Sequence, residues 1–395
     1  MALEHLRCHL LTGLGWNLLA HTQWNWIPVI QIADVTGVYG VSFLVVLVNV
    51  GLWQLTQARG SAISDSPSVK SAGRRFLLAG FCLMGALTYG SFRIRQFPSP
   101  PVTGHPSPFT IALVQGNIPQ YEKWNEAFQE AIWDRYEWLT HEAAKKTPDL
   151  MIWPETSVPG YLEEEAIWRR LEKLIREVRT PLLVGVPMAD LQGMHVFNSA
   201  VLFDSDGTAL DRYDKVHLVP FGEYLPLIPI LGWLRNFVLM GNFSPGKRYT
   251  VFHPSPSTSH PSPPFSVLIC FEDLFPDLCR RFIRQGARML VVITNDAWFI
   301  HSAASLQHAQ ASVFRAVEGR VWVARAANTG WSGFIDPAGR RLATPQQIPR
   351  FEPGIAAAKL SGAFSLSGYV RWGDWFPILC LILTGLAFFP SKRSV

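Results

Sequence analysis

Three residues in this chain have the types needed for nucleophilic catalysis, and each follows or ends an apolar run. Glu155 follows DLMIW (149–153) and a proline, Lys215 lies in RYDKVHLVPFGE, and Cys270 ends FSVLIC. A cysteine becomes a nucleophile when a base takes its proton or a cation favours the thiolate. Glu155 can take that proton, and Lys215 can stabilise an oxyanion. Spacing alone does not bring them together, and each also reads as an ordinary surface Glu, solvated Lys or buried Cys.

The elements around these residues predict an α/β fold. Helical spacing covers 124–146 and 163–179, and a further helix closes at 281–286. Apolar runs predict strands at 109–115, 149–153, 181–186, 198–203, 267–270, 289–294, 321–327 and 333–336. Several of these strands lack a polar face, which indicates a sheet covered on both sides. Because such sheets collect functional residues at strand ends, Glu155, Lys215 and Cys270 are placed for chemistry.

Composition narrows the class of protein. The chain has 395 residues, of which 48% are hydrophobic and only 16% charged, whereas an ordinary soluble domain carries about 25% charged residues. This excludes a disordered chain and a nucleic-acid partner, and it predicts a globular domain with membrane segments. The five cysteines are scattered, so neither a disulfide framework nor a zinc ligand set is expected.

Apolar stretches at about 35–55, 76–92 and 375–390 predict membrane-spanning helices. The segment between the first two is basic, which places it in the cytoplasm and residues 97–370 outside. Its charged residues are Arg59, Lys70, Arg74 and Arg75 against Asp65. The N-terminus then starts outside without a signal, and we expect that upstream spans are missing from this chain.

The predicted domains follow from these stretches. They are an N-terminal membrane region (1–96), a Pro-rich linker (97–108), a catalytic domain (109–365) and a C-terminal transmembrane helix with a basic tail (366–395). A further apolar run at 224–243 predicts a lid or arm in the membrane surface, with a plain core helix as the alternative.

Four motifs carry a family resemblance. They are WPE (153–155), KVHLVPFGEYLP (215–226), CFE (270–272) and NDAWF (295–299), and in this order they resemble the carbon–nitrogen hydrolase (nitrilase) superfamily. VPFGEYLP and NDAWF with flanking spans are similar to the apolipoprotein N-acyltransferase family in particular. LVQGNIPQ (113–120) and the pair Lys123–Trp124 also resemble that family.

The resemblance implies a four-layer αββα sandwich inserted between transmembrane helices. It implies Cys270 as the nucleophile, Glu155 as the general base and Lys215 as the stabiliser of the tetrahedral intermediate. Four further residues match positions near the family's active site: Glu223, Glu272, Trp124 and Asn198.

The implied reaction has two steps and needs no metal or cofactor. Cys270 takes an acyl chain from a phospholipid as a thioester, and the amine of a diacylglyceryl-cysteine apolipoprotein then attacks it. The implied location is the bacterial inner membrane, multi-pass, with the catalytic domain on the periplasmic side. The family has more spans than this chain, and a separate segment that supplies the missing helices is one explanation.

Two residues depart from the family pattern. Phe271 stands where Tyr is frequent, and Ile300 follows NDAWF where Gly is common. An Ile is not expected to adopt the positive φ that Gly permits. Two other functions stay open: a membrane-anchored amidase that uses water as the acceptor, and a low-activity scaffold that binds lipid or lipoprotein.

Overall fold

Two β-sheets form the centre of the protein in the computed structural model, which describes residues 1–59, 67–97, 109–190, 194–225, 243–254, 263–361 and 365–388. The first sheet has the order β11-β1-β2-β3-β4-β5 and the second β10-β9-β8-β7-β6. The first comprises β11 (Gly354–Leu360), β1 (Phe109–Gln115), β2 (Leu150–Ile152), β3 (Leu182–Ala189), β4 (Val196–Phe203) and β5 (Ala209–Asp214). The second comprises β10 (Gln347–Ile348), β9 (Ser332–Ile335), β8 (Trp322–Ala327), β7 (Met289–Thr294) and β6 (Phe265–Ile269).

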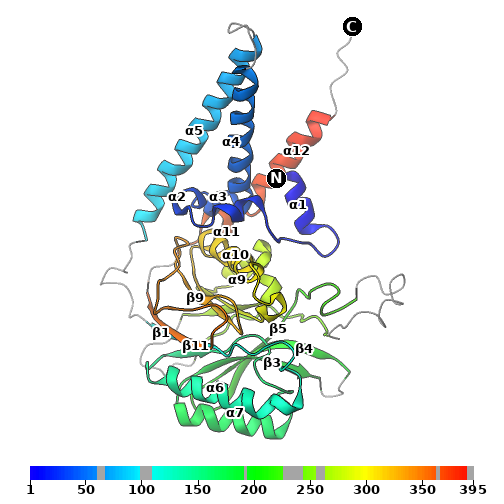
Figure 1. Cartoon of the computed structure of the whole chain (residues 1–395), viewed down its shortest axis with the longest axis vertical. Helices are drawn as coiled ribbons and strands as arrows, with labels where there is room; N and C mark the ends of the chain where they lie inside the picture. The colour runs from blue at the N-terminus through cyan, green and yellow to red at the C-terminus, as the bar shows by residue number, and fades with distance from the viewer. Residues whose placement is uncertain are drawn as a thin grey trace.

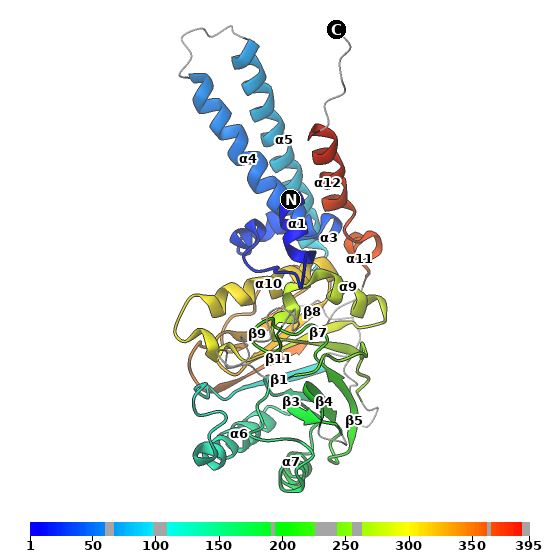
Figure 2. The same cartoon turned by 90° about the vertical axis from the view of Figure 1, so that its right-hand side faces the viewer.

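Helices cover the outer face of each sheet. Helices α6 (Gln129–Ala144) and α7 (Glu165–Val178) lie on the first sheet, and α9 (Pro276–Arg284) and α10 (Ala304–Gly319) lie on the second (Figures 1 and 2). In β1, Ile111 and Leu113 belong to the core between the sheets, while Ala112 and Val114 pack with α6 and α7. This alternation is the two-residue period of a strand buried on both faces. The four-layer αββα sandwich is thereby confirmed.

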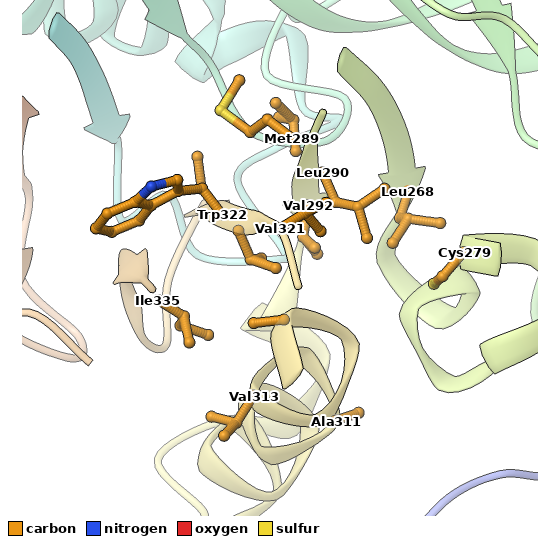
Figure 3. Close-up of a cluster of buried hydrophobic side chains, with 14 of the residues drawn as sticks. Leu268, Cys279, Met289, Leu290, Val292, Ala311, Val313, Val321, Trp322 and Ile335 are labelled. Carbon is orange, nitrogen blue, oxygen red and sulfur yellow. The ribbon is translucent and has the colours of Figure 1, made fainter. Parts of the chain in front are cut away.

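In the second sheet, every residue of β6, β7, β8 and β9 is buried. Its parallel strands β6 and β7 contain only buried residues, since β-sheet and helix both cover them. Figure 3 shows Leu268 and Val292 from these strands grouped with Val313 of α10 and Cys279 of α9. This packing fixes the ends of β6 and β7, which Cys270 and Asn295 follow directly.

Two long apolar helices project from the side that carries α9 and α10 (Figure 1). They are α4 (Val38–Arg59) and α5 (Pro67–Arg95), and each contains a stretch long and apolar enough to cross a membrane, Val38–Gln57 and Gly73–Arg95. The first begins at Val38 rather than at 35, because Gly37 at φ 67 ends the short helix α3 (Ala33–Thr36).

The third expected span is only partly described. Helix α12 (Trp375–Phe388) is apolar but has 14 residues. The linker at 98–108, most of the apolar run at 224–243 and the basic tail after 388 lie outside the described residues.

A buried charge cluster joins the apolar helices to the sandwich. Asp34 of α3 pairs with Arg93 of α5 at 2.8 Å and with Arg320, just after α10, at 2.7 Å. Arg320 is fully buried. Nearby, a Glu318 carboxylate oxygen accepts a hydrogen bond of 2.7 Å from the N–H of Val38 and so caps α4. The first turn of α4 is therefore anchored to α10.

We expect Asp34→Ala to destabilise the protein by about 3–5 kcal/mol, because it leaves the buried Arg320 cation without its carboxylate. Asp134→Ala is the matched control, since Asp134 is 74% exposed and pairs with Arg170 at 3.5 Å, and such a pair contributes at most about 1 kcal/mol. Thermal unfolding in detergent measures both. Equal melting temperatures for the two variants would remove the anchoring role of Asp34.

Candidate active site

Strand ends from both sheets deliver the three expected catalytic residues. Glu155 follows β2, Lys215 comes directly after β5, and Cys270 comes directly after β6 of the opposite sheet. Cys270 has φ 52, where the chain turns out of the strand into a 3-10 helix, η4 (Cys270–Leu274). A positive φ at a non-glycine residue is uncommon and is often found at functional sites.

Lys215 is held as an ammonium between two carboxylates. Its side chain is 1% exposed, and its Nζ lies 2.8 Å from Glu223 Oε1 and 3.6 Å from Glu155 Oε1. Burial opposes the charge, but Glu223 and then Glu155 outweigh it and raise the pKa of Lys215 above its usual value. The site therefore contains a permanent positive charge that is suited to stabilising an oxyanion.

The Glu155 carboxylate is fixed by both sheets. Asn198 of β4 donates from Nδ2 to Glu155 Oε1 at 2.7 Å and to Glu223 Oε1 at 3.0 Å. The main-chain N–H of Asn295, which follows β7, donates to Glu155 Oε2 at 2.8 Å. Asn198 and Glu223, both expected near the site, thus orient the two groups assigned as base and cation.

The Cys270 thiol rests in its protonated form. Burial, followed by the charge of Glu155, raises the pKa of the thiol well above its usual range, and Lys215 acts in the opposite direction. These charges act on one another across the site. Because the thiol does not ionise unaided, a base must remove its proton before Cys270 can act as a nucleophile.

Glu272 accepts hydrogen bonds from several segments that surround the site. Its Oε1 accepts hydrogen bonds from Tyr213 at 2.8 Å and from the N–H groups of Val216 at 2.8 Å and His217 at 3.0 Å, and its Oε2 accepts from Ile269 at 2.8 Å. Burial raises the pKa of Glu272 to about 7. Glu272 therefore ties the segment after Lys215 to Ile269, the last residue of β6 before Cys270.

Trp124 does not join the cluster of charged groups. Its side chain is 53% exposed, and it makes no hydrogen bond within the part of the chain that the structure describes. It lies instead on the surface of the loop after β1.

The sequence analysis did not identify a buried cluster of charged residues next to Cys270. His308 of α10 lies 2.9 Å from Asp296 Oδ1, 3.1 Å from Asp273 Oδ1 and 3.3 Å from the main-chain oxygen of Cys270. Burial disfavours the imidazolium, but Asp273 and Asp296 raise the pKa of His308 to about 9. Arg325 pairs with both carboxylates, so two cations balance two anions. Of these four residues, only Asp296 belongs to a motif that the sequence analysis identified, NDAWF.

Lys123 is another residue near the site that the sequence analysis did not single out by itself. Lys123 is buried beside Glu155 and donates from Nζ to its main-chain oxygen at 3.0 Å, but the sequence offered it only as part of a motif.

Among the described residues, no group of three or more His, Cys, Asp or Glu side chains is arranged to hold a metal ion.

The expectation for Ile300 is wrong. Ile300 has φ 49 and ψ −151, a conformation that is essentially confined to glycine. The preceding Asp296 is buried and held by His308 and Arg325, and the Ile300 N–H bonds the Ala297 oxygen at 3.2 Å. These anchors outweigh the strain. The Ile300 side chain itself is 74% exposed and contributes little packing.

Comparisons with known families agree with the fold. The family model for carbon-nitrogen hydrolases matches residues 110–362, and the model for the apolipoprotein N-acyltransferase N-terminal domain matches residues 1–51. These matches confirm the resemblance drawn from the motifs.

Curated relatives align over almost the whole chain. An apolipoprotein N-acyltransferase of Geobacter metallireducens is 38% identical, and the match covers 100% of this chain and 74% of the relative. One of Methylococcus capsulatus is 33% identical, with 99% and 72% covered. Among solved structures, a nitrilase-superfamily amidase from Nesterenkonia aligns with a TM-score of 0.49 and 19% identity, over 73% of this chain and 99% of that one.

The strain at Ile300 gives a stability prediction. Ile300→Gly should stabilise the protein by about 1 kcal/mol, because relief of about 1–3 kcal/mol of strain exceeds the roughly 0.4–1 kcal/mol lost through the more flexible unfolded chain. Ile300→Ala is the matched control, since it removes the same exposed side chain but keeps the Cβ. Thermal unfolding should rank the glycine variant above the alanine variant, and the reverse order would contradict the strain.

Proposed function

Since the chain belongs to the apolipoprotein N-acyltransferase family of carbon–nitrogen hydrolases, we propose that Cys270 carries an acyl chain from a phospholipid to the N-terminal amine of a diacylglyceryl-cysteine apolipoprotein. The observation that carries the proposal is the meeting of Glu155, Lys215 and the Cys270 thiol at the ends of strands from both sheets. A base, a fixed cation and a thiol are the parts that acyl transfer through a thioester requires.

In the first step, Glu155 removes the Cys270 proton as sulfur attacks the ester carbonyl carbon of the phospholipid. The Lys215 ammonium stabilises the oxyanion that forms. Lys215 stays protonated because its ammonium is paired with the Glu223 carboxylate. When the intermediate collapses, the carbon–oxygen bond of the ester breaks. The leaving alkoxide takes the proton from Glu155 and departs as a lysophospholipid, and Cys270 remains acylated.

In the second step, the neutral amine of the acceptor attacks the thioester carbon. Glu155, again a carboxylate, takes a proton from the attacking nitrogen, and Lys215 stabilises the second oxyanion. The carbon–sulfur bond then breaks, and the Cys270 thiolate recovers the proton from Glu155. A thioester suits this step because amines attack it readily. The product is an N-acylated lipoprotein.

We further propose a multi-pass enzyme of the bacterial inner membrane with the sandwich on the periplasmic side. Helices α4 and α5 reach the sandwich with their Val38 and Arg95 ends (Figure 1). The basic residues Arg59, Lys70, Arg74 and Arg75 therefore belong to the opposite ends of the two helices. Positively charged residues that flank membrane spans stay in the cytoplasm, which supports the opposite side for the catalytic residues.

The orientation is testable with two engineered cysteines in spheroplasts. A membrane-impermeant maleimide should label Lys173→Cys, on the exposed face of α7 where this side chain is 78% exposed, and should leave Ser64→Cys unlabelled until the membrane is opened. The unsubstituted protein gives the background of its five own cysteines. Labelling of Ser64→Cys alone would reverse the proposed topology.

The reaction is testable with the full chain in phospholipid bilayers. We expect mass spectrometry to detect an acyl adduct on Cys270 and its transfer to a diacylglyceryl lipopeptide, with both signals lost in Cys270→Ala. Cys279→Ala is the matched control, because Cys279 is a buried thiol of α9 outside the site. It should retain both signals.

Two outcomes would overturn the proposal. An adduct that is released as free fatty acid in the presence of lipopeptide would make water the acceptor and the protein an amidase-like hydrolase. A folded wild-type chain that forms no adduct would favour the scaffold that binds lipid without turning it over.

A further inference from the structure

Lys123 is a buried lysine whose position the proposed reaction has not yet used. Lys123 is 4% exposed, and its Nζ donates a hydrogen bond to the main-chain oxygen of Glu155 at 3.0 Å. Within the described ranges it forms no ion pair, in contrast to Lys215 with its two carboxylates. Burying an unpaired ammonium is costly, so its location beside the general base calls for a compensating interaction.

The loop that carries Lys123 is fixed by the second sheet. The Ile118 N–H donates to Asn328 Oδ1 at 3.0 Å, and Asn328 Nδ2 returns a bond of 2.8 Å to the Ile118 oxygen. Gln120 Oε1 accepts from Asn295 Nδ2 at 2.8 Å. Asn295 is also the residue whose N–H holds the Glu155 carboxylate. Asn295 therefore positions both the loop and the Glu155 carboxylate. Lys123 adds a direct contact from the loop to Glu155.

The charges of Glu155, Glu223 and Lys215 do not balance without Lys123. Glu155 and Glu223 carry two negative charges and Lys215 one positive charge, which leaves a net charge of minus one on these three side chains. A net negative site opposes both the thiolate and the oxyanion. Lys123 interacts electrostatically with Glu155 and with Cys270, the two groups between which the reaction moves its proton. An ammonium at this position neutralises the site.

We propose that Lys123 is a positioning residue that holds Glu155 through its main-chain oxygen and supplies the second positive charge needed for acylation of Cys270. The inference rests on the proposed acyl transfer and deepens it. Lys215 stabilises charge on the substrate, whereas Lys123 balances the negative charge as it passes between Glu155 and the sulfur.

The two lysines differ in how firmly they hold their protons. Burial lowers the pKa of Lys123 to about 8, against the opposing effects of Glu155 and Cys270, whereas the pKa of Lys215 is raised. Of the two lysines, only Lys123 therefore changes charge just above neutral pH. The acylation rate should fall as the pH rises through about 8, because the site regains its uncompensated negative charge.

The experiment measures the rate of acyl-adduct formation on Cys270 from pH 6 to about pH 10 for the full chain in phospholipid bilayers. Lys123→Met should slow adduct formation by about 100-fold at neutral pH, as loss of one electrostatic donor does in other enzymes. Lys123→Arg keeps a cation that does not lose its proton in this range, so it should keep activity and lose the fall above pH 8. Lys173→Met, on the exposed face of α7, is the matched control with the wild-type profile.

A structural role alone would lower the rate without changing the pH profile. Wild-type rates in Lys123→Met, or an unchanged alkaline fall in folded Lys123→Arg, would overturn the inference. Alkylation of Cys270 by iodoacetamide at pH 7 provides a second readout that needs no lipid, and Lys123→Met should slow it. If the wild type forms no acyl adduct, the proposed function fails, and the alkylation rates still decide whether Lys123 assists the thiol.

Discussion

The carboxylate of Glu155 is the group on which the arrangement of the active site depends. Asn198 reaches it from the first sheet and the Asn295 N–H from the second, while Lys215 approaches the same oxygen as Asn198. A carboxylate held by several donors cannot rotate freely, so the direction in which it accepts a proton is set before substrate binds. In the proposed reaction, the Cys270 thiol from the opposite sheet therefore meets a carboxylate that is already oriented.

Two clusters of buried, paired charges help to hold this fold together. Behind Cys270, His308 and Arg325 neutralise Asp273 and Asp296. At the base of the apolar helices, the buried Asp34 pairs with Arg320 and Arg93. Burying an unpaired charge costs far more than burying a matched set, so each cluster permits one arrangement of the elements it joins. One cluster supports the segment that carries Cys270, and the other fixes the two long apolar helices to the sandwich.

The strands that the sequence predicted are those with continuous apolar runs, because burial on both faces leaves a clear hydrophobic signal. β1, β2, β3, β4, β6, β7, β8 and β9 belong to this group. β5 (ALDRYD) escaped because it is an edge strand with polar residues. Helix α10 escaped for a different reason: it is buried almost all round, and its small residues give no amphipathic stripe.

The sequence by itself determined which residue types were available, in which order, and that the chain carries apolar stretches of membrane-spanning length, because these are properties of local composition. The motifs around Glu155, Lys215 and Cys270 also lie within short segments. Only the tertiary structure decided that Lys123 lies beside Glu155 and that His308 lies beside Cys270, since both depend on contacts between segments far apart in the chain. It likewise decided the conformation of Ile300, where buried anchors outweigh the local preference of a β-branched residue.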